Sequence, residues 1–195
     1  MPSSEHKAVL QRYLNSARDA LMWKAEGLSD YDLRRPLTAS GTNILGVIKH
    51  LASVDMGYFT DVFGRECPVS FPWFEPDAQP NDDLYATPNE SKEFVFDLMA
   101  TARQVTNDTI EALDLDDVGR VAWWGPEGTD VTLHTIMVHM LAEYNRHGGH
   151  IDIVRELIDN QIGYRDGATN LPSNDSEWWS DYLARVNNAA SHFLP

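Results

Sequence analysis

Residues 132–158 read TLHTIMVHMLAEYNRHGGHIDIVRELI, a stretch that combines helical periodicity with closely spaced histidine and glutamate residues. The apolar members recur at three- and four-residue spacing: Leu133, Ile136, Met137, Met140, Leu141, Ile151, Ile153, Val154 and Leu157. His139, Glu143, His147 and His150 follow one another at steps of four, four and three, which on a helix places them within about 80° of one another. We therefore expect a long helix whose polar stripe faces the protein interior.

Carboxylate and imidazole groups on a buried face need partners. Glu143 and His147 lie one helical turn apart and are both ligands for first-row metal ions, so the stripe predicts a divalent-metal site. Two other readings stay open: each histidine could be a hydrogen-bonded core residue, and the glutamate could pair with an arginine of its own helix. Gly148 and Gly149 each cost about 1 kcal/mol in a helix relative to alanine, so we expect them to permit close packing of another helix or a ligand.

The composition limits the classes of function. With 195 residues the chain is long enough for a real core, and we expect one domain over residues 1–195. Its 15 basic and 30 acidic residues give a net charge of −15, which repels phosphate backbones and anionic lipid; nucleic-acid and membrane partners are disfavoured. A lone cysteine, Cys67, and an N-terminus without an apolar signal core indicate a cytoplasmic protein.

The same periodicity predicts three further long helices, over residues 3–27, 42–63 and 91–115, and a shorter one over 175–192. In the first of these, Arg18 falls on the outer, charged face. In the last, the predicted core side consists of Trp178, Tyr182, Leu183 and Val186. Four long helices with little strand content predict an all-α fold, a four-helix bundle with a short extra C-terminal helix, in which sites lie between facing helices.

A histidine on the second long helix extends the candidate site. His50 shares a face with Gly46, Val47, Val54 and Tyr58, so we expect it to point inward. It therefore becomes a ligand candidate from a different helix.

The segments between the helices carry aromatic residues. Residues 64–89 contain five of the ten prolines, and a loop of this length is typical of a lid or a binding element. Trp73 and Phe74 in that loop are expected either to close over a site or, more simply, to pack on the helices. Trp123 and Trp124 belong to a hairpin-like excursion just before the histidine-rich helix and would shape the mouth of a pocket.

Two segments resemble a known superfamily. Residues 43–52 (NILGVIKHLA) and 139–156 (HMLAEYNRHGGHIDIVRE) are similar to DinB-like proteins, and more narrowly to the N-terminal domain of mycothiol-dependent maleylpyruvate isomerase. The resemblance implies an up-down-down-up four-helix bundle, often a homodimer, with a divalent metal, zinc or nickel, held by three side chains. In the isomerase-like branch these are one histidine on the second helix and a glutamate and histidine on the last. They carry over to His50, Glu143 and His147.

The resemblance also implies a chemistry. The isomerase has a further C-terminal domain after the bundle, whereas stand-alone bundles of this type resemble S-transferases that use a low-molecular-weight thiol such as mycothiol, bacillithiol or glutathione. Two histidines and a carboxylate leave open coordination positions, and a thiol that enters one is deprotonated. The expected activity is transfer of this thiol to a small electrophile, or isomerisation of the electrophile. Cys67 is not expected to be the nucleophile, because nothing in the sequence places it beside a base.

Several assignments stay open. His139 and His150 share the face of the ligands and are expected to be their hydrogen-bond partners or alternative ligands. Arg146 and Arg155 could bind a substrate carboxylate or form salt bridges within their own helix. Two alternatives to an enzyme remain: a non-catalytic divalent-metal-binding stress or detoxification protein, and a satisfied polar core without metal.

Overall fold

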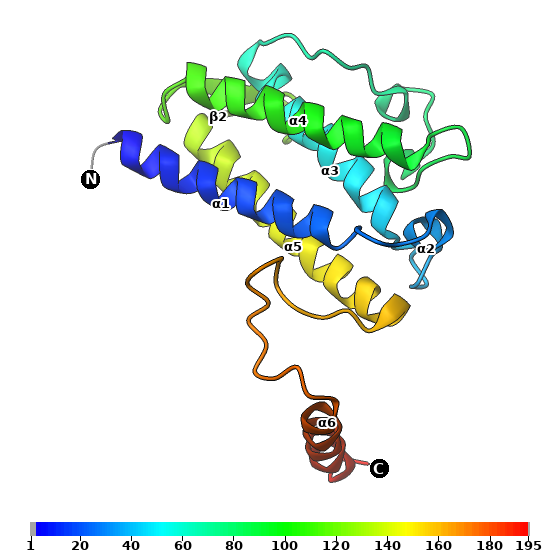
Figure 1. Cartoon of the computed structure of the whole chain (residues 1–195). Helices are drawn as coiled ribbons and strands as arrows, with labels where there is room; N and C mark the ends of the chain where they lie inside the picture. Colours follow the sequence, from blue (N-terminus) through cyan, green and yellow to red (C-terminus); the bar gives the residue numbers. More distant parts are fainter. Residues whose placement is uncertain (1–2, 195) are drawn as a thin grey trace.

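The computed structural model describes residues 3–194 and is helical apart from one small hairpin (Figure 1). Its elements in chain order are α1 (Ser3–Trp23), α2 (Asp30–Arg34), α3 (Ile44–Phe59), α4 (Lys92–Ala112), β1 (Val118–Val121), β2 (Thr129–Thr132), α5 (Leu133–Asp159) and α6 (Ser176–Ser191). Short 3₁₀ turns occur at Asp61–Phe63, Pro72–Phe74 and Asp82–Leu84. The prediction of an all-α fold is confirmed. Among the described residues, no helix has the length and apolar character that crossing a bilayer demands.

Polar side chains fix where three of the long helices begin. Asn43, Ser91 and Thr132 precede α3, α4 and α5, and each accepts a hydrogen bond from the backbone amide three residues further along. Such caps satisfy amide groups that have no partner inside the helix and contribute about 0.5–2 kcal/mol each. At the other end of α5, Asn160 adopts a left-handed conformation with φ of 61° and ends the helix.

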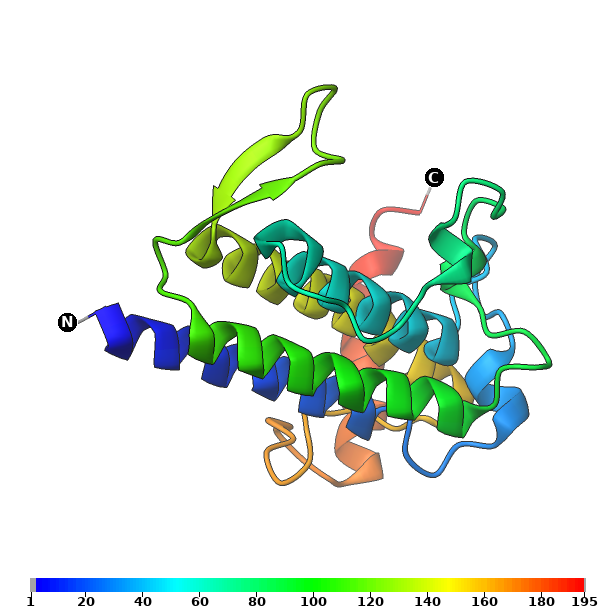
Figure 2. The same ribbon diagram turned by 90° about the horizontal axis from the view of Figure 1, so that it is seen from above.

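Helices α1 and α5 run in one direction and α3 and α4 in the other (Figures 1 and 2). Hydrogen bonds hold the antiparallel helices α1 and α4 together at both ends. The Lys7 ammonium donates to the Leu113 carbonyl (2.7 Å), and Arg103 donates to the Asp19 carboxylate (2.6 Å). The parallel helices α3 and α4 are joined by the long connection over residues 60–91. This is the up-down-down-up arrangement that the resemblance implied.

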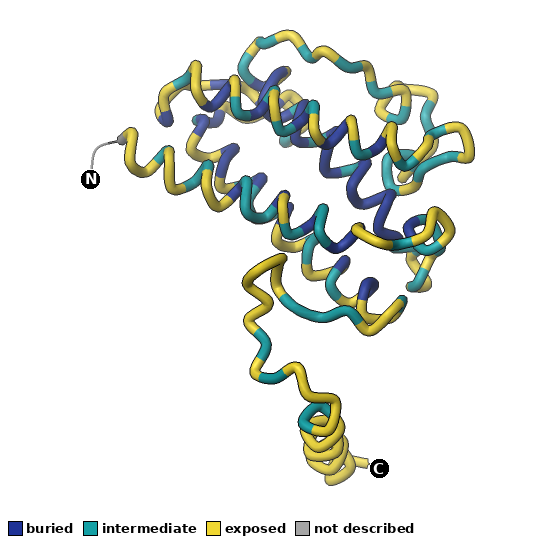
Figure 3. Tube along the Cα trace, in the orientation of Figure 1, coloured by how far each residue is buried: buried dark blue, intermediate teal, exposed yellow. Residues whose placement is uncertain are grey.

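The core is centred on α3, most of whose residues are buried (Figure 3). Its fully buried apolar side chains include Ile44, Leu45, Ile48, Leu51, Met56 and Phe59. A helix that is buried on nearly every side has little room for charged residues, so each polar group that α3 carries needs a specific partner.

One buried polar group, Asp55, joins all four long helices. Its carboxylate accepts hydrogen bonds from Arg18 Nη2 (2.6 Å) on α1, Thr106 Oγ1 (3.1 Å) on α4 and the Tyr144 hydroxyl (2.8 Å) on α5. The prediction that Arg18 lies on the outer face is wrong, because its side chain is only 1% exposed. The periodicity of α1 indicated a charged outer face, but a long arginine side chain can reach a buried carboxylate on a neighbouring helix.

Helix α6 stands away from the bundle, at the end of the segment 160–175 (Figure 1). Three of the four residues on its predicted core side are exposed, Tyr182 by 44%, Leu183 by 58% and Val186 by 46%, whereas Trp178 is half-buried. Two apolar positions near the end of α5, Ile153 and Leu157, are likewise 61% exposed. Amphipathic spacing shows which face of a helix is apolar, but it does not show whether another element covers that face.

Candidate metal centre

The three predicted ligands meet between α3 and α5. His50 from α3 and Glu143 and His147 from α5 each offer one ligand atom, and these atoms lie within 4.8 Å of one another. The His50 and His147 ring centroids are 5.0 Å apart, and His147 Nε2 lies 3.5 Å from Glu143 Oε2. All three side chains are half-buried, which lets a small molecule reach the cluster. Two imidazoles and one carboxylate from facing helices form a donor set for a divalent metal.

A glycine on α3 brings a loop close to this cluster. A Cβ at Gly46 would overlap the backbone carbonyl of Leu84, so only a glycine lets residues 82–84 approach α3 this closely. Gly46 lies one turn before His50 on the same face of the helix. The close approach therefore sets the loop directly beside His50, the first candidate ligand.

Asp83 of this loop holds His50 by a short hydrogen bond. The distance from His50 Nδ1 to Asp83 Oδ2 is 2.5 Å, and the Nε2 side of the ring is left for a ligand. Burial raises the pKa of Asp83, but the hydrogen bond and charge of His50 outweigh it, so the net pKa is lowered and the carboxylate is ionised at neutral pH. Histidine ligands commonly donate their second nitrogen to such a carboxylate, which fixes the tautomer. Sequence reasoning missed Asp83; its only signal was the acidic pair within the proline-rich loop.

Lys49, the residue before His50, fastens the same loop from the other side. Its ammonium donates to the carbonyls of Asp82 (2.9 Å) and Tyr85 (3.1 Å), pairs with Glu90 (2.9 Å) and lies 4.0 Å from the centroid of the Trp73 ring. This buried ammonium thus has the partners that its desolvation requires. Two consecutive residues of α3 therefore tie down the loop that orients His50.

His147 has a lowered pKa and one ring nitrogen without a hydrogen-bond partner among the described residues. Burial lowers its pKa, the neighbouring His50 lowers it further, and Glu143 opposes both, so that the net pKa lies below the ordinary value. The neutral ring is the form that binds a metal. Its Nδ1 is buried and has no hydrogen-bond partner among the described residues. The described side chains therefore do not form a fully satisfied polar cluster around this ring.

The other candidates on α5 lie outside the cluster. His139 packs edge-on against Tyr58 (4.8 Å between centroids) and Trp124 (4.9 Å). His150 is exposed, with its ring 5.6 Å from that of His147, and Arg146 is exposed as well. Roles for His139 and His150 as hydrogen-bond partners of the ligands, and for Arg146 as a carboxylate-binding residue, stay predictions.

Arg155 ties the end of α5 to the backbone that follows α1. Its guanidinium pairs with Asp159 (2.7 Å) and donates to the backbone carbonyls of Lys24 (2.7 Å) and Glu26 (2.7 Å). The salt-bridge alternative for Arg155 is therefore the one observed, and its donors are engaged away from the cluster.

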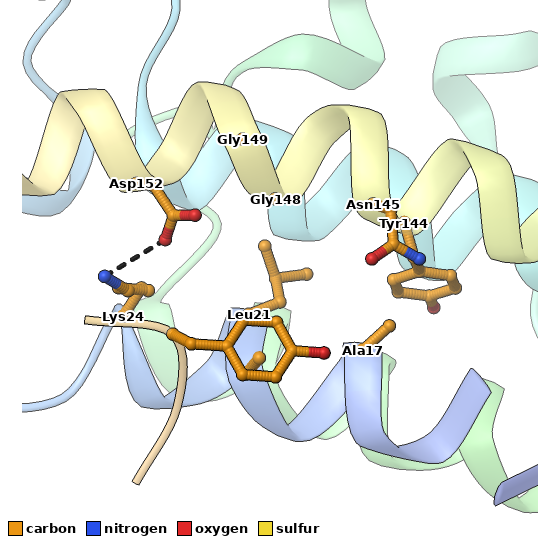
Figure 4. A pocket seen from close by; sticks show the side chains of 10 residues that line it. Ala17, Leu21, Lys24, Tyr144, Asn145, Gly148, Gly149 and Asp152 are labelled. Carbon is orange, nitrogen blue, oxygen red and sulfur yellow. Dashed lines mark ion pairs between the residues drawn. The ribbon is translucent and has the colours of Figure 1, made fainter. Parts of the chain in front are cut away.

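The adjacent glycines of α5 do not serve close packing. A Cβ at Gly148 or Gly149 would meet no described atom within 4 Å, so the expectation of a tight helix contact is wrong. Instead, both border a small cavity of about 110 Å³ between α5 and α1, beside the ion pair of Lys24 with Asp152 (Figure 4). This cavity lies on the α1 side of α5, whereas the cluster of candidate ligands lies between α5 and α3.

Replacing Asp83 by asparagine tests its role as the residue that orients His50. The variant keeps the size of the side chain but removes the ionised acceptor, and we expect the affinity for Zn²⁺ to fall by about 10–100-fold. Competition with a chromogenic chelator measures this change. Asp77→Asn, an exposed position in the same loop, is the matched control and should bind Zn²⁺ as the wild type does. Equal affinity in all three proteins would remove Asp83 from the site.

The up-down-down-up bundle of four long helices is the DinB-like fold that the resemblance implied. Within this class the family is shown by sequence: a model described as mycothiol-S-transferase matches residues 9–160, from α1 to the end of α5. The chain belongs to the mycothiol-S-transferase family. The narrower relation to the maleylpyruvate isomerase branch stays a prediction.

A solved structure shares the fold. A conserved protein from Enterococcus faecalis superposes with a TM-score of 0.55 at 14% sequence identity, over 79% of this chain and 97% of that chain. At this identity the likeness shows the fold alone. No curated protein matches the chain.

Proposed function

We propose that the protein is a metal-dependent transferase that joins a low-molecular-weight thiol of the mycothiol type to a small electrophile. The observation that carries the proposal is the convergence of His50, Glu143 and His147, from two helices, in a chain that belongs to the mycothiol-S-transferase family. The family supports the thiol as cosubstrate, and the cluster supports the metal.

The residues fit a divalent cation. Three neutral or anionic donors lie within one coordination sphere of each other, and His147 carries a buried nitrogen without a partner among residues 3–194. Zinc suits two imidazoles and a carboxylate, and nickel is the alternative. Three protein ligands leave at least one position open, as in catalytic zinc sites. A bound cation there would lower the pKa of a coordinated thiol and so supply a thiolate at neutral pH.

The chain's own residues prepare the site for this chemistry. Asp83 fixes the His50 ring, and the lowered pKa of His147 favours the unprotonated ring that a metal requires. Glu143 brings one negative charge to the donor set, which is less than the charge of a divalent cation. In the reaction the thiol proton passes to solvent, the sulfur forms a bond with an electrophilic carbon, and the leaving group departs with its bonding electrons.

The first experiment measures the metal content of the protein, purified without a histidine tag, by mass spectrometry. We expect close to one divalent ion per chain in the wild type and loss of that ion in His50→Ala, Glu143→Ala and His147→Ala. Because a ligand that binds only the folded state stabilises it, chelator should lower the melting temperature of the wild type but not of the three variants. A wild-type protein that is purified without metal and does not bind added zinc or nickel would contradict the site hypothesis.

The second experiment separates an enzyme from a metal-binding protein without catalysis. Mycothiol, bacillithiol and glutathione are each supplied with an electrophile, and formation of the thioether is followed with and without chelator. We expect turnover with one thiol and its loss on metal removal. A protein that holds one ion per chain but gives no turnover with any thiol would favour the non-catalytic reading.

A further inference from the structure

A second cavity lies along α3, next to the ligand cluster. It has a volume of about 360 Å³ and is lined mainly by apolar and aromatic residues: Val54, Gly57, Tyr58, Phe71, Phe74 and Trp123. Ser53 and Asp61 complete the lining. The volume lies in the range of ordinary ligand pockets, and an apolar cavity of about 150 Å³ already binds benzene.

The register of α3 and α5 shows where this cavity lies relative to the cluster. His50 faces His147 and, eight residues further along α3, Tyr58 faces His139, so the two helices run antiparallel. Val54 lies midway between His50 and Tyr58, as Glu143 does between His147 and His139. At 1.5 Å per residue, Val54 is about 6 Å along the helix axis from His50. The cavity therefore begins about one helical turn from the ligands.

The walls of the cavity come from the two segments that cross over α3. Phe71 and Phe74 belong to the proline-rich loop, and their ring centroids are 5.8 Å apart in an edge-to-face arrangement. Trp123 comes from the hairpin and lies 5.4 Å from the ring of Tyr58. The Tyr58 hydroxyl accepts from the indole nitrogens of Trp123 (3.4 Å) and Trp124 (3.0 Å). With these polar edges satisfied, the rings offer apolar faces to a ligand.

The floor of the cavity is open because α3 carries a glycine there. A Cβ built on Gly57 meets no described atom within 4 Å. A glycine inside a helix lowers helix stability relative to alanine, and packing of the described residues does not require this one. Its effect is to leave space on the face of α3 that continues from His50 and Val54.

The charges around the cavity select against anions. The side chains that line it include one acid, Asp61, and no arginine or lysine among the described residues. The nearby Lys49 is committed to Glu90 and to backbone carbonyls. No side chain that lines the cavity offers a carboxylate a cationic partner, so an anion bound away from the proposed metal would be desolvated unfavourably.

We propose that this cavity binds the electrophile, and that the electrophile is an uncharged, apolar molecule with an aromatic ring rather than a carboxylate. The inference rests on the proposed function, because it takes the thiol to be activated at His50, Glu143 and His147. The ring lies between Phe74 and Trp123, and the reacting carbon points along α3 toward the ligands.

The test uses a matched pair of unreactive probes, neutral 1-naphthol and anionic 1-naphthoate, titrated into the metal-loaded protein by calorimetry. We expect naphthol to bind and naphthoate to bind at least about tenfold more weakly. Gly57→Leu fills the cavity from its floor and should weaken the binding of naphthol by about tenfold or more, while the metal content stays at the wild-type level. Equal affinity for the two probes, or unchanged naphthol binding in Gly57→Leu, would overturn the inference.

A second variant covers the case in which Gly57→Leu does not fold. Phe74→Ala removes a wall residue that is 48% exposed and should also weaken the binding of naphthol. The control is Phe94→Ala, which removes a 41% exposed aromatic residue of α4 and should leave naphthol binding unchanged. With an aromatic electrophile as substrate, Phe74→Ala should raise the KM for the electrophile and leave the KM for the thiol unchanged. Naphthol binding without thiol-dependent turnover would reject the proposed function alone, and turnover without naphthol binding would reject this cavity alone.

Discussion

Asp55→Ala is expected to cost about 3–5 kcal/mol of unfolding free energy, because it leaves a buried arginine without its counter-ion. Arg18 is 1% exposed and lies 2.6 Å from the Asp55 carboxylate. Burial lowers the pKa of its guanidinium, but Asp55 and Tyr144 raise that pKa by more. The net pKa is therefore raised, and the side chain stays charged. The loss is a large part of the roughly 5–15 kcal/mol that stabilises a domain. Urea unfolding followed by circular dichroism measures it.

Two comparisons make the Asp55 prediction specific. Asp19→Ala removes a carboxylate from an exposed ion pair with Arg103 and should cost less than about 1 kcal/mol. Replacing both buried partners, as in Arg18→Met with Asp55→Leu, should recover part of the loss, since an apolar pair needs no counter-ion. A single Asp55→Ala variant that is as stable as Asp19→Ala would show that Arg18 reaches water.

Gly46→Ala is expected to destabilise the protein by about 1–3 kcal/mol and to weaken metal binding, although alanine favours a helix. The added methyl group would overlap the Leu84 carbonyl, which is backbone and has no rotamer to change. The loop must then move from α3, and Asp83 moves with it away from His50. Thermal melting of the metal-free protein and chelator competition report the two effects separately.

Gly57→Ala, in the same helix, is the stability control for Gly46→Ala. No described atom lies within 4 Å of the added Cβ, so this variant should be as stable as the wild type or more stable by up to about 1 kcal/mol. Similar melting temperatures for the two variants would mean that the loop does not depend on close approach at Gly46.

The periodic parts of the chain could be predicted from sequence, and the parts fixed by single contacts could not. The long helices and the stripe that carries Glu143 and His147 follow from spacing alone, the hairpin from the glycine and proline turn residues 125–128, and His50 from the face it shares with Val47 and Val54. Assigning the three as one ligand set needed the family resemblance. Their convergence depends on how α3 lies on α5, which no local pattern specifies.

The irregular loop and the charged residues explain what was missed. Asp83 reaches His50 from a loop without periodicity, held there by Gly46 and Lys49. Arg18 and Lys49 carry charges that a sequence pattern assigns to the surface, yet both are buried with partners from distant elements. The apolar face of α6 was recognised, but its exposure depends on the path of residues 160–175.

The four residues of the Asp55 network are made at different times during synthesis. The chain leaves the ribosome from its N-terminus, so Arg18 and Asp55 emerge first, then Thr106, and Tyr144 last. Until α5 has emerged, the carboxylate lacks one of its donors and α3 lacks the helix that covers its ligand face. The first helix and the last long helix are paired across more than a hundred residues of sequence. The core of the bundle is thus incomplete until the segment that carries Glu143 and His147 has been made.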